Sequence, residues 1–233
     1  MTFRAWLDHP EHVWVRHFMF QLHFWIGAAA TLWVVLISMT GAVLVFRDEI
    51  SRVASIDWVL RLHTTLLAGR AGAAINTAGA FALLVLCVTG AVIWWPGVAH
   101  WRRSLTVDWA ARLPRISWDA HSALGVWFFV FVLVWGLSGL YLVQPHLFDF
   151  MYRLDPRDRV ADQILFSLST LHFGRFTLTT QIIWGLTALV PAALAVTGAF
   201  VCCRRVVFKS PANPKHSVRT AGNHLSSTPG KAS

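Results

Sequence analysis

The sequence predicts an all-α polytopic membrane protein with four transmembrane helices formed by two parallel two-helix repeats. Hydrophobic residues make up 56% of the 233 residues and charged residues only 13%, which is about half the charged share of an average soluble domain. The chain has four long stretches without Asp, Glu, Lys or Arg, at 17–46, 71–101, 120–148 and 176–203. This composition excludes intrinsic disorder and makes a soluble globular enzyme a poor interpretation.

Each uncharged stretch is long enough to cross a lipid bilayer, because a spanning helix needs about 20 apolar residues. We expect helices at roughly 18–46, 73–95, 121–144 and 177–203. The first stretch is too long for the apolar region of a signal peptide and has no clear cleavage site after it. It is therefore expected to stay in the mature protein as an anchor.

The basic residues predict the orientation of these helices. The N-terminal segment, the 96–117 loop and the C-terminal tail hold 12 Lys and Arg residues, against 8 in the segments on the other side. The positive-inside rule then predicts that both termini are cytoplasmic. A transmembrane domain is expected over 1–205 and a disordered cytoplasmic tail over 206–233. The net charge of +9 lies in short segments between apolar stretches, so we expect no nucleic-acid partner.

The two halves of the chain, 17–97 and 115–205, repeat the same landmarks. In each half a His precedes a Gly by 18 residues, and a later Leu-His pair precedes a Thr-Gly pair by 27 or 26 residues. These landmarks are His23, Gly41, His63 and Gly90 in the first half, and His121, Gly139, His172 and Gly198 in the second. Both copies have the same topology, so the repeats are expected to be parallel.

The predicted topology sorts four histidines into two pairs. His23 and His121 begin odd-numbered helices near the cytoplasmic face, whereas His63 and His172 precede even-numbered helices near the outer face. Eighteen residues make five helical turns, about 27 Å. Gly41 and Gly139 are therefore expected at the level of the outer pair, where they would leave space for a flat group or let helices approach closely.

Two histidines in each leaflet suggest two haems, because two imidazoles can ligate one iron from opposite sides. The sequence contains no Cys-x-x-Cys-His, so the haems would be b-type, without covalent attachment. A single intramembrane His could instead form an ordinary interhelical hydrogen bond. A non-haem metal site is less favoured, because no Asp, Glu or Cys accompanies these histidines at ligand spacing.

Four arginines near the histidines are candidates for binding the haem propionates. Arg16 and Arg115 precede the inner pair, and Arg70 and Arg175 follow the outer pair. The alternative is that these side chains extend to the membrane surface from the ends of their helices.

These motifs resemble the PepSY-associated transmembrane helix family of bacterial inner-membrane proteins. The matching stretches within about 17–205 are Leu22–Gly27, Met39–Gly41, Phe46–Glu49, Leu62–Leu67, Thr89–Gly97, Asp119–Trp127 and Leu171–Arg175. The resemblance implies a protein similar to haem-b ferric-siderophore reductases, with His23, His63, His121 and His172 as ligands of the haem iron. Such proteins usually carry a sizeable periplasmic domain where this chain has only 47–72. An outer site is therefore expected from two short segments, 47–72 and 145–176.

We therefore expect a di-haem b membrane oxidoreductase that reduces ferric iron or a ferric chelate on the periplasmic side. The sequence has no GxGxxG or P-loop motif for a nucleotide cofactor. Electrons are expected from an external donor, either a quinol, a reduced flavin or a flavoprotein. Two alternatives remain open: an electron-transfer subunit of a separate periplasmic oxidoreductase, and a haem-free membrane partner or assembly protein.

Overall fold

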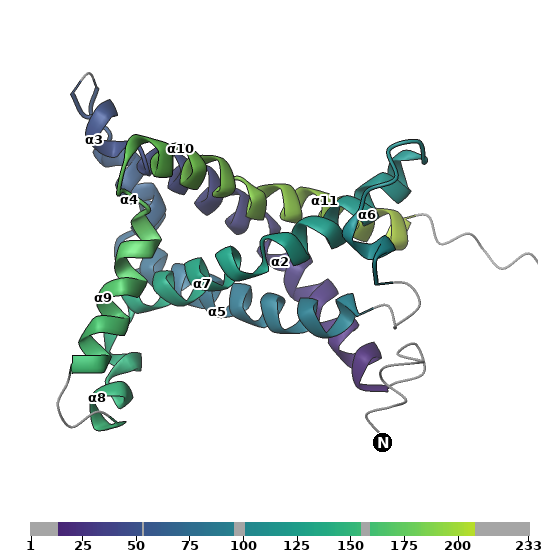
Figure 1. Cartoon of the computed structure of the whole chain (residues 1–233), viewed down its shortest axis with the longest axis horizontal. Coiled ribbons are helices and arrows are strands. Elements are labelled where there is room, and N and C mark those ends of the chain that lie inside the picture. Colours follow the sequence, from purple (N-terminus) through teal and green to yellow (C-terminus); the bar gives the residue numbers. More distant parts are fainter. Residues whose placement is uncertain (1–13, 53, 96–100, 155–158, 208–233) are drawn as a thin grey trace, which may run out of the picture. The chain divides into compact units, whose positions relative to one another are not determined.

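The computed structural model describes residues 14–52, 54–95, 101–154 and 159–207. All regular elements in these ranges are helices, which confirms the predicted all-α class (Figure 1). The chain divides into two compact units, Met1–Cys202 and Cys203–Ser233, and the arrangement reported below is that of the first unit. The predicted tail lies outside the described residues from 208 onward.

Three apolar stretches form helices long enough to cross a membrane. They are α2 (Trp14–Leu44), α5 (Gly69–Trp94) and the stretch Leu178–Val206, which contains α10 (Leu178–Thr187) and most of α11 (Val190–Val207). A fourth crossing is reached when α6 (Leu113–Trp127) and α7 (Phe129–Val143), which are bent by 66°, are counted together. The chain is thus a multi-pass membrane protein, as predicted.

The crossing formed by α6 and α7, which is third in chain order, differs from the continuous helix predicted at 121–144. It begins earlier, at Leu113, and breaks at Phe128, whose φ of −106° and ψ of 9° leave the helical region. Residues 127–132 are all aromatic or β-branched, and such residues are weak helix formers. The Trp127 indole also donates to the Leu105 carbonyl oxygen at 3.1 Å, which ties the end of α6 to a neighbouring loop rather than to α7.

A second break, between α10 and α11, is closed by a side chain from α2. Pro191 lies at the second position of α11 and has no N–H group to continue a helix from α10. Ser38, which is buried, donates to the Ala188 carbonyl oxygen at 2.5 Å and accepts from the Ala192 N–H at 3.1 Å. Unpaired backbone groups are costly in a membrane, so this serine stabilises the break and joins the two halves of the chain.

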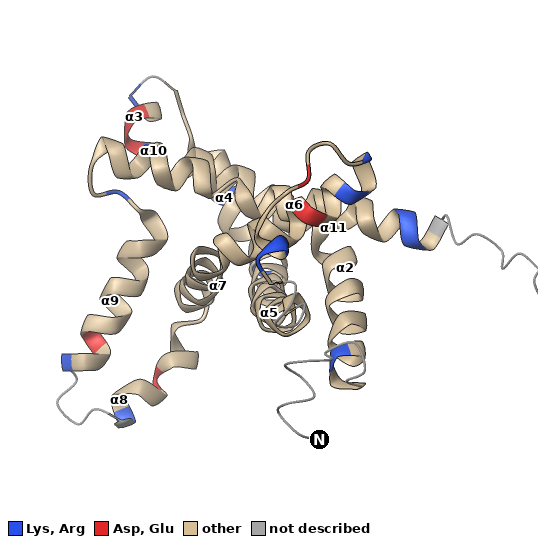
Figure 2. Cartoon of the chain, turned by 45° about the vertical axis from the view of Figure 1, so that its right-hand side comes forward, with Lys and Arg blue, Asp and Glu red and all other residues tan. Residues whose placement is uncertain are grey.

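Short helices connect the crossings at equivalent places in the two halves. Between α2 and α5 these are α3 (Arg47–Ile50) and α4 (Asp57–Thr65). Between α7 and α10 they are the 3-10 turn η3 (Pro145–Phe148), α8 (Phe150–Leu154) and α9 (Arg159–Phe173). Figure 1 shows α4 and α9 at the end of the bundle opposite to α6 and to the first residues of α2. Figure 2 shows charged residues near the ends of the long helices, with uncharged stretches between them.

Candidate site formed by two histidine pairs

The helices bring the four repeated histidines together in two pairs. His23 on α2 faces His121 on α6, with ring centroids 6.1 Å apart, and we call these residues the first pair. His63 on α4 faces His172 on α9, with ring centroids 6.5 Å apart, and these form the second pair. The pairing is the one predicted from the repeats, with one histidine from each half of the chain in each pair.

The hydrogen bonds of His23 determine which of its ring nitrogens carries the proton. Its Nδ1 lies 2.9 Å from the Thr89 hydroxyl on α5. That hydroxyl uses its one proton to donate to the Val85 carbonyl oxygen at 2.7 Å, so it accepts from the histidine. His23 Nδ1 therefore carries the hydrogen in the neutral ring, and the lone pair lies on Nε2, which has no hydrogen-bond partner in the described part of the chain.

The other three histidines make the same kind of contact. Each ring nitrogen Nδ1 meets a hydroxyl that already donates to a backbone carbonyl of its own helix. The Nδ1–hydroxyl contacts are His63 to Thr40 at 2.9 Å, His172 to Ser138 at 2.8 Å and His121 to Thr197 at 3.2 Å. The corresponding carbonyl acceptors are Leu36 at 2.8 Å, Val134 at 2.6 Å and Ala193 at 2.7 Å. His121 Nδ1 also donates to the Leu194 carbonyl oxygen at 2.9 Å.

Metal-binding histidines commonly show this arrangement. A ligating imidazole usually donates its other N–H to a fixed acceptor, which sets both the tautomer and the ring orientation. Thr89 and Ser138 are the most completely buried of these hydroxyl residues, at 1% and 0% exposure. These two acceptors are therefore shielded from water, which would otherwise compete for the histidine N–H.

A glycine follows each of the four hydroxyl residues and leaves room for the histidine ring. A Cβ atom would lie 3.2 Å from His63 at Gly41, and 3.7 Å from His172 at Gly139. Both glycines lie at the second pair, as predicted, but they contact histidine rings directly. Gly90 and Gly198 do the same at the first pair, with Cβ positions 3.3 Å from His23 and 3.0 Å from His121.

The separation of the rings suits a metal ion between them. A metal–imidazole nitrogen bond is about 2.0 Å long, and the nitrogen lies about 1.1 Å from its ring centroid, so two rings on opposite sides of one ion have centroids about 6 Å apart. The observed separations are 6.1 Å and 6.5 Å. Within the described ranges no three His, Cys, Asp or Glu side chains gather at one point. Each pair therefore offers two nitrogen ligands, which fits haem because its macrocycle supplies the remaining ones.

The short helices that carry the second pair are anchored by side chains of the long helices. Asn76 on α5 donates to the His63 and Thr64 carbonyl oxygens at 2.8 Å and 2.7 Å, and accepts from the Trp33 indole at 2.8 Å. In the other half, the Trp184 indole donates to the Leu171 carbonyl oxygen at 2.7 Å. Both contacts satisfy carbonyls in the last turn of a helix, which lack partners within it.

The second pair lies in surroundings that keep imidazole neutral. His63 and His172 are on α4 and α9, outside the candidate spans. Burial lowers the pKa of each to about 4, and for His172 the neighbouring His63 contributes in the same direction. Neutral imidazole is the form that binds metal, so both rings are in the ligating protonation state near pH 7.

The four candidate arginines have different surroundings. Arg16 donates to the Ile93 carbonyl oxygen on α5 at 2.9 Å, and Arg70 is exposed at the start of α5. Arg115 pairs with Asp119 on α6 at 2.9 Å, and Arg175 pairs with Asp48 on α3 at 3.0 Å. The last two already have carboxylate partners, which the sequence analysis did not anticipate. Propionate binding by the four arginines stays a prediction.

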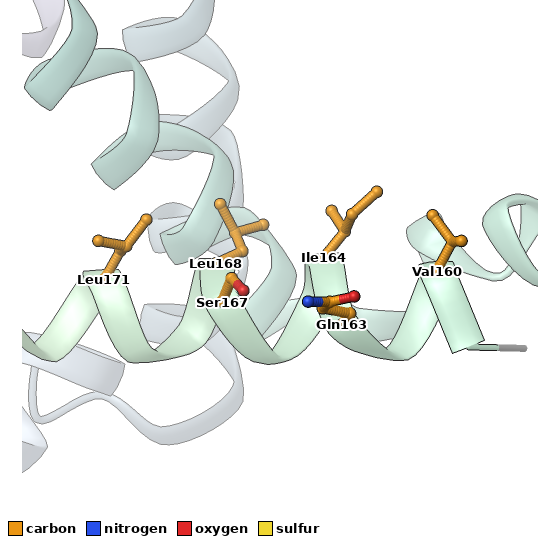
Figure 3. A pocket seen from close by; sticks show the side chains of 6 residues that line it. All are labelled: Val160, Gln163, Ile164, Ser167, Leu168 and Leu171. Atoms are coloured by element: carbon orange, nitrogen blue, oxygen red, sulfur yellow. The ribbon is translucent and has the colours of Figure 1, made fainter.

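A separate groove of about 430 Å³ runs along α9 (Figure 3). It is lined by Val160, Gln163, Ile164, Ser167, Leu168 and Leu171. Its last lining residue precedes His172, but its lining is mostly apolar and holds no titratable side chain. The paired histidines, rather than this groove, are therefore the candidate site for redox chemistry.

Sequence reasoning identified the histidines but missed the groups that orient them. Thr40, Thr89, Ser138 and Thr197 entered the analysis only within repeat landmarks, and so did Gly90 and Gly198. A signal was present: a hydroxyl residue followed by Gly occurs four times at matching positions. Its meaning depends on which helices pack together, because each dipeptide contacts a histidine on a different helix.

The fold and the site define a class of protein: an all-helical, multi-pass membrane protein with two facing histidine pairs between its helices. A family model described as the PepSY-associated TM region matches residues 20–56 and 54–155, and the chain belongs to this family. The matched residues include His23, His63 and His121, whereas His172 lies beyond them. No curated protein and no solved structure matches the chain.

Proposed function

We propose that this protein is a di-haem b oxidoreductase of the bacterial inner membrane, which moves electrons across the bilayer to reduce ferric iron or a ferric chelate in the periplasm. The supporting observation is that four histidines lie in two pairs, with the Nδ1 atom of each ring held by a hydroxyl oxygen. Bis-imidazole ligation is a common way of holding haem, and helical bundles build cofactor sites from facing helices.

His23 and His121 would hold one haem, and His63 and His172 the other. Bound haem supplies one-electron iron chemistry, while the protein supplies ligation, orientation and control of the potential. The hydroxyl residues hold each Nδ1 proton in place, so a histidine cannot turn its other nitrogen toward the iron without losing its acceptor. The four glycines have no side chain that would displace the histidine rings.

The orientation of the protein follows from its basic residues. With both termini in the cytoplasm, the first pair lies near the cytoplasmic face and the second pair near the periplasm. The segments 47–72 and 145–176 carry the two histidines of the second pair on α4 and α9, and they would form the surface that meets the acceptor. Reduction of ferric to ferrous iron transfers one electron and no proton, so this surface needs no general acid or base.

Electrons would enter at the cytoplasmic side from a quinol, a reduced flavin or a flavoprotein. Arg102, Arg103 and Arg112 lie in the predicted cytoplasmic loop, and their charge favours an anionic donor. Anionic lipid headgroups would be attracted equally well.

The function is tested by proteoliposomes of known orientation that contain dithionite-reduced protein. A membrane-impermeant ferric chelate on the side of loop 47–72 should reoxidise the haems faster than the same chelate on the side of the tail. His63→Ala should abolish this advantage. The matched control is His146→Ala, since His146 is on η3 in the same connecting segment as His172 but contacts Gln144 at 2.9 Å instead of a pair partner. If ferric chelates leave the reduced protein unchanged while a partner protein oxidises it, the ferric reductase proposal is wrong and an electron-transfer subunit takes its place.

A further inference from the structure

One buried polar group lies one helical turn beyond the glycine that contacts His23. The indole Nε1 of Trp94, in the last turn of α5, is buried and has no hydrogen-bond partner in the described part of the chain. A buried N–H group without an acceptor is costly, and most such groups in proteins are paired.

The position of Trp94 on α5 relates it to the first pair. Gly90 lies against the His23 ring, and Trp94 follows four residues later, on the same side of the helix and about 6 Å further along. Thr89, the residue before this glycine, holds His23 Nδ1. The orphan N–H therefore belongs to the next helical turn beyond the histidine, toward the end of the bundle where α2 begins.

A positive charge from α2 reaches the same turn of α5. Arg16 precedes His23 by seven residues, which is two turns on the same helix face and about 10 Å. It donates one N–H group to the Ile93 carbonyl oxygen, next to Trp94, out of the five that a guanidinium carries. The carboxylate of Asp119, two residues before His121, is already paired with Arg115. The end of α5 thus combines two hydrogen-bond donors. One is the neutral Trp94 N–H group, which lacks an acceptor in the described part of the chain, and the other is the positively charged Arg16 guanidinium.

We propose that the Trp94 indole N–H, together with Arg16, binds a propionate carboxylate of the haem held by the first pair. This inference rests on the proposed function and adds to it a specific donor and a rotational orientation of the first haem, with a propionate edge toward the last turn of α5. A carboxylate there satisfies the orphan donor and accepts a charge-assisted bond from the guanidinium.

The test is haem release from the full-length protein to an excess of a haem-scavenging apoprotein. Trp94→Phe keeps a ring and removes the N–H group. It should release half of the bound haem about tenfold faster than wild type, because a hydrogen bond to a charged group is lost. The other half, held by the second pair, should be released at the wild-type rate, which also shows that the variant is folded. The matched control is Trp25→Phe, since Trp25 lies near His23 on α2 but is 64% exposed, and it should behave as wild type.

A second measurement separates the hydrogen bond from ring packing. Wild type and Trp94→Phe are reconstituted with the dimethyl ester of haem b, which lacks ionised propionates. The difference in release rate should shrink to less than twofold. Equal rates with ordinary haem, or an undiminished difference with the ester, would overturn the inference while leaving the proposed function intact. A folded wild-type protein that binds no haem would overturn both.

Discussion

Hydroxyl side chains decide which nitrogen of each histidine is available at this site. Every one of the four hydroxyls donates within its own helix and accepts from a histidine on another helix. Each hydroxyl therefore acts as the acceptor for a histidine N–H group, so Nδ1 carries the hydrogen and Nε2 carries the lone pair. A threonine or serine inside a transmembrane helix is often explained by its bond to a preceding carbonyl, but here that bond sets the tautomer of a potential ligand.

Removing one of these acceptors should weaken one haem and leave the other unchanged. Thr89→Val keeps the shape of the side chain but removes the acceptor for His23, and we expect roughly 10- to 100-fold weaker binding of the first haem, as for other orienting partners of metal ligands. Ser138→Ala should have the same effect on the second haem. Haem titration of the apoprotein measures both affinities.

The control for these variants is Thr31→Val. Thr31, on α2, likewise donates to a backbone carbonyl, that of Gly27, at 2.7 Å, but in the described part of the chain it makes no hydrogen bond to any of the four histidines. Its haem affinities should match those of wild type. If Thr89→Val and Thr31→Val bind haem equally well, the hydroxyl does not orient the ligand.

The histidines could be predicted from sequence because spacing and topology place them at two depths. Their orienting groups could not, since His23 and Thr89 are 66 residues apart and meet only when α2 packs along α5. The ion pairs of Arg115 and Arg175 could not be predicted for a related reason. The sequence does not show that Asp119 contacts Arg115 and that Asp48 contacts Arg175, because these contacts depend on how the helices are placed.

Short helices, rather than the crossings themselves, carry the second pair. The turn after α9 depends on Gly174, which has a φ of +61°, and a Cβ atom there would overlap the Trp184 ring. The same indole holds the Leu171 carbonyl next to His172. This turn therefore sets the direction of the chain after α9 and helps to hold His172 in position.

Gly174→Ala should destabilise the protein and displace His172. The strain of a positive φ costs about 1 kcal/mol or more, and the overlap with the indole adds about 1–3 kcal/mol. Gly69→Ala is the matched control, because Gly69 has a similar φ of +56° but open space around its Cβ position. We expect a loss of about 1 kcal/mol for Gly69→Ala and of about 2–4 kcal/mol for Gly174→Ala. Thermal unfolding and haem content measure these effects, and equal results for the two variants would contradict the role given to Trp184.

The helix boundaries show the limits of sequence reasoning for elements. Apolar stretches predicted where the chain crosses the membrane, because composition dominates that property. They did not predict the bend at Phe128 or the break closed by Ser38. Both depend on tertiary contacts, since Ser38 and Ala188 are 150 residues apart.

The whole molecule repeats one arrangement twice. In each half a helix that begins a crossing carries one histidine, a short helix before the next crossing carries another, and hydroxyl-glycine dipeptides of the same half contact both. Each histidine then pairs with its counterpart from the other half. Neither half contains a complete site, so the two repeats are expected to fold and bind cofactor together.

The most direct test of this account is the haem content of the folded, purified chain, measured as haem per polypeptide with a reduced-minus-oxidised spectrum. We predict two non-covalent b-type haems in wild type. His23→Ala and His121→Ala should each lose the same haem, and His63→Ala and His172→Ala the other. Because paired ligands act as a unit, the double variant of a pair should be little worse than either single one. A folded protein without a haem spectrum, or loss of the same haem from His23→Ala and His63→Ala, would contradict the account.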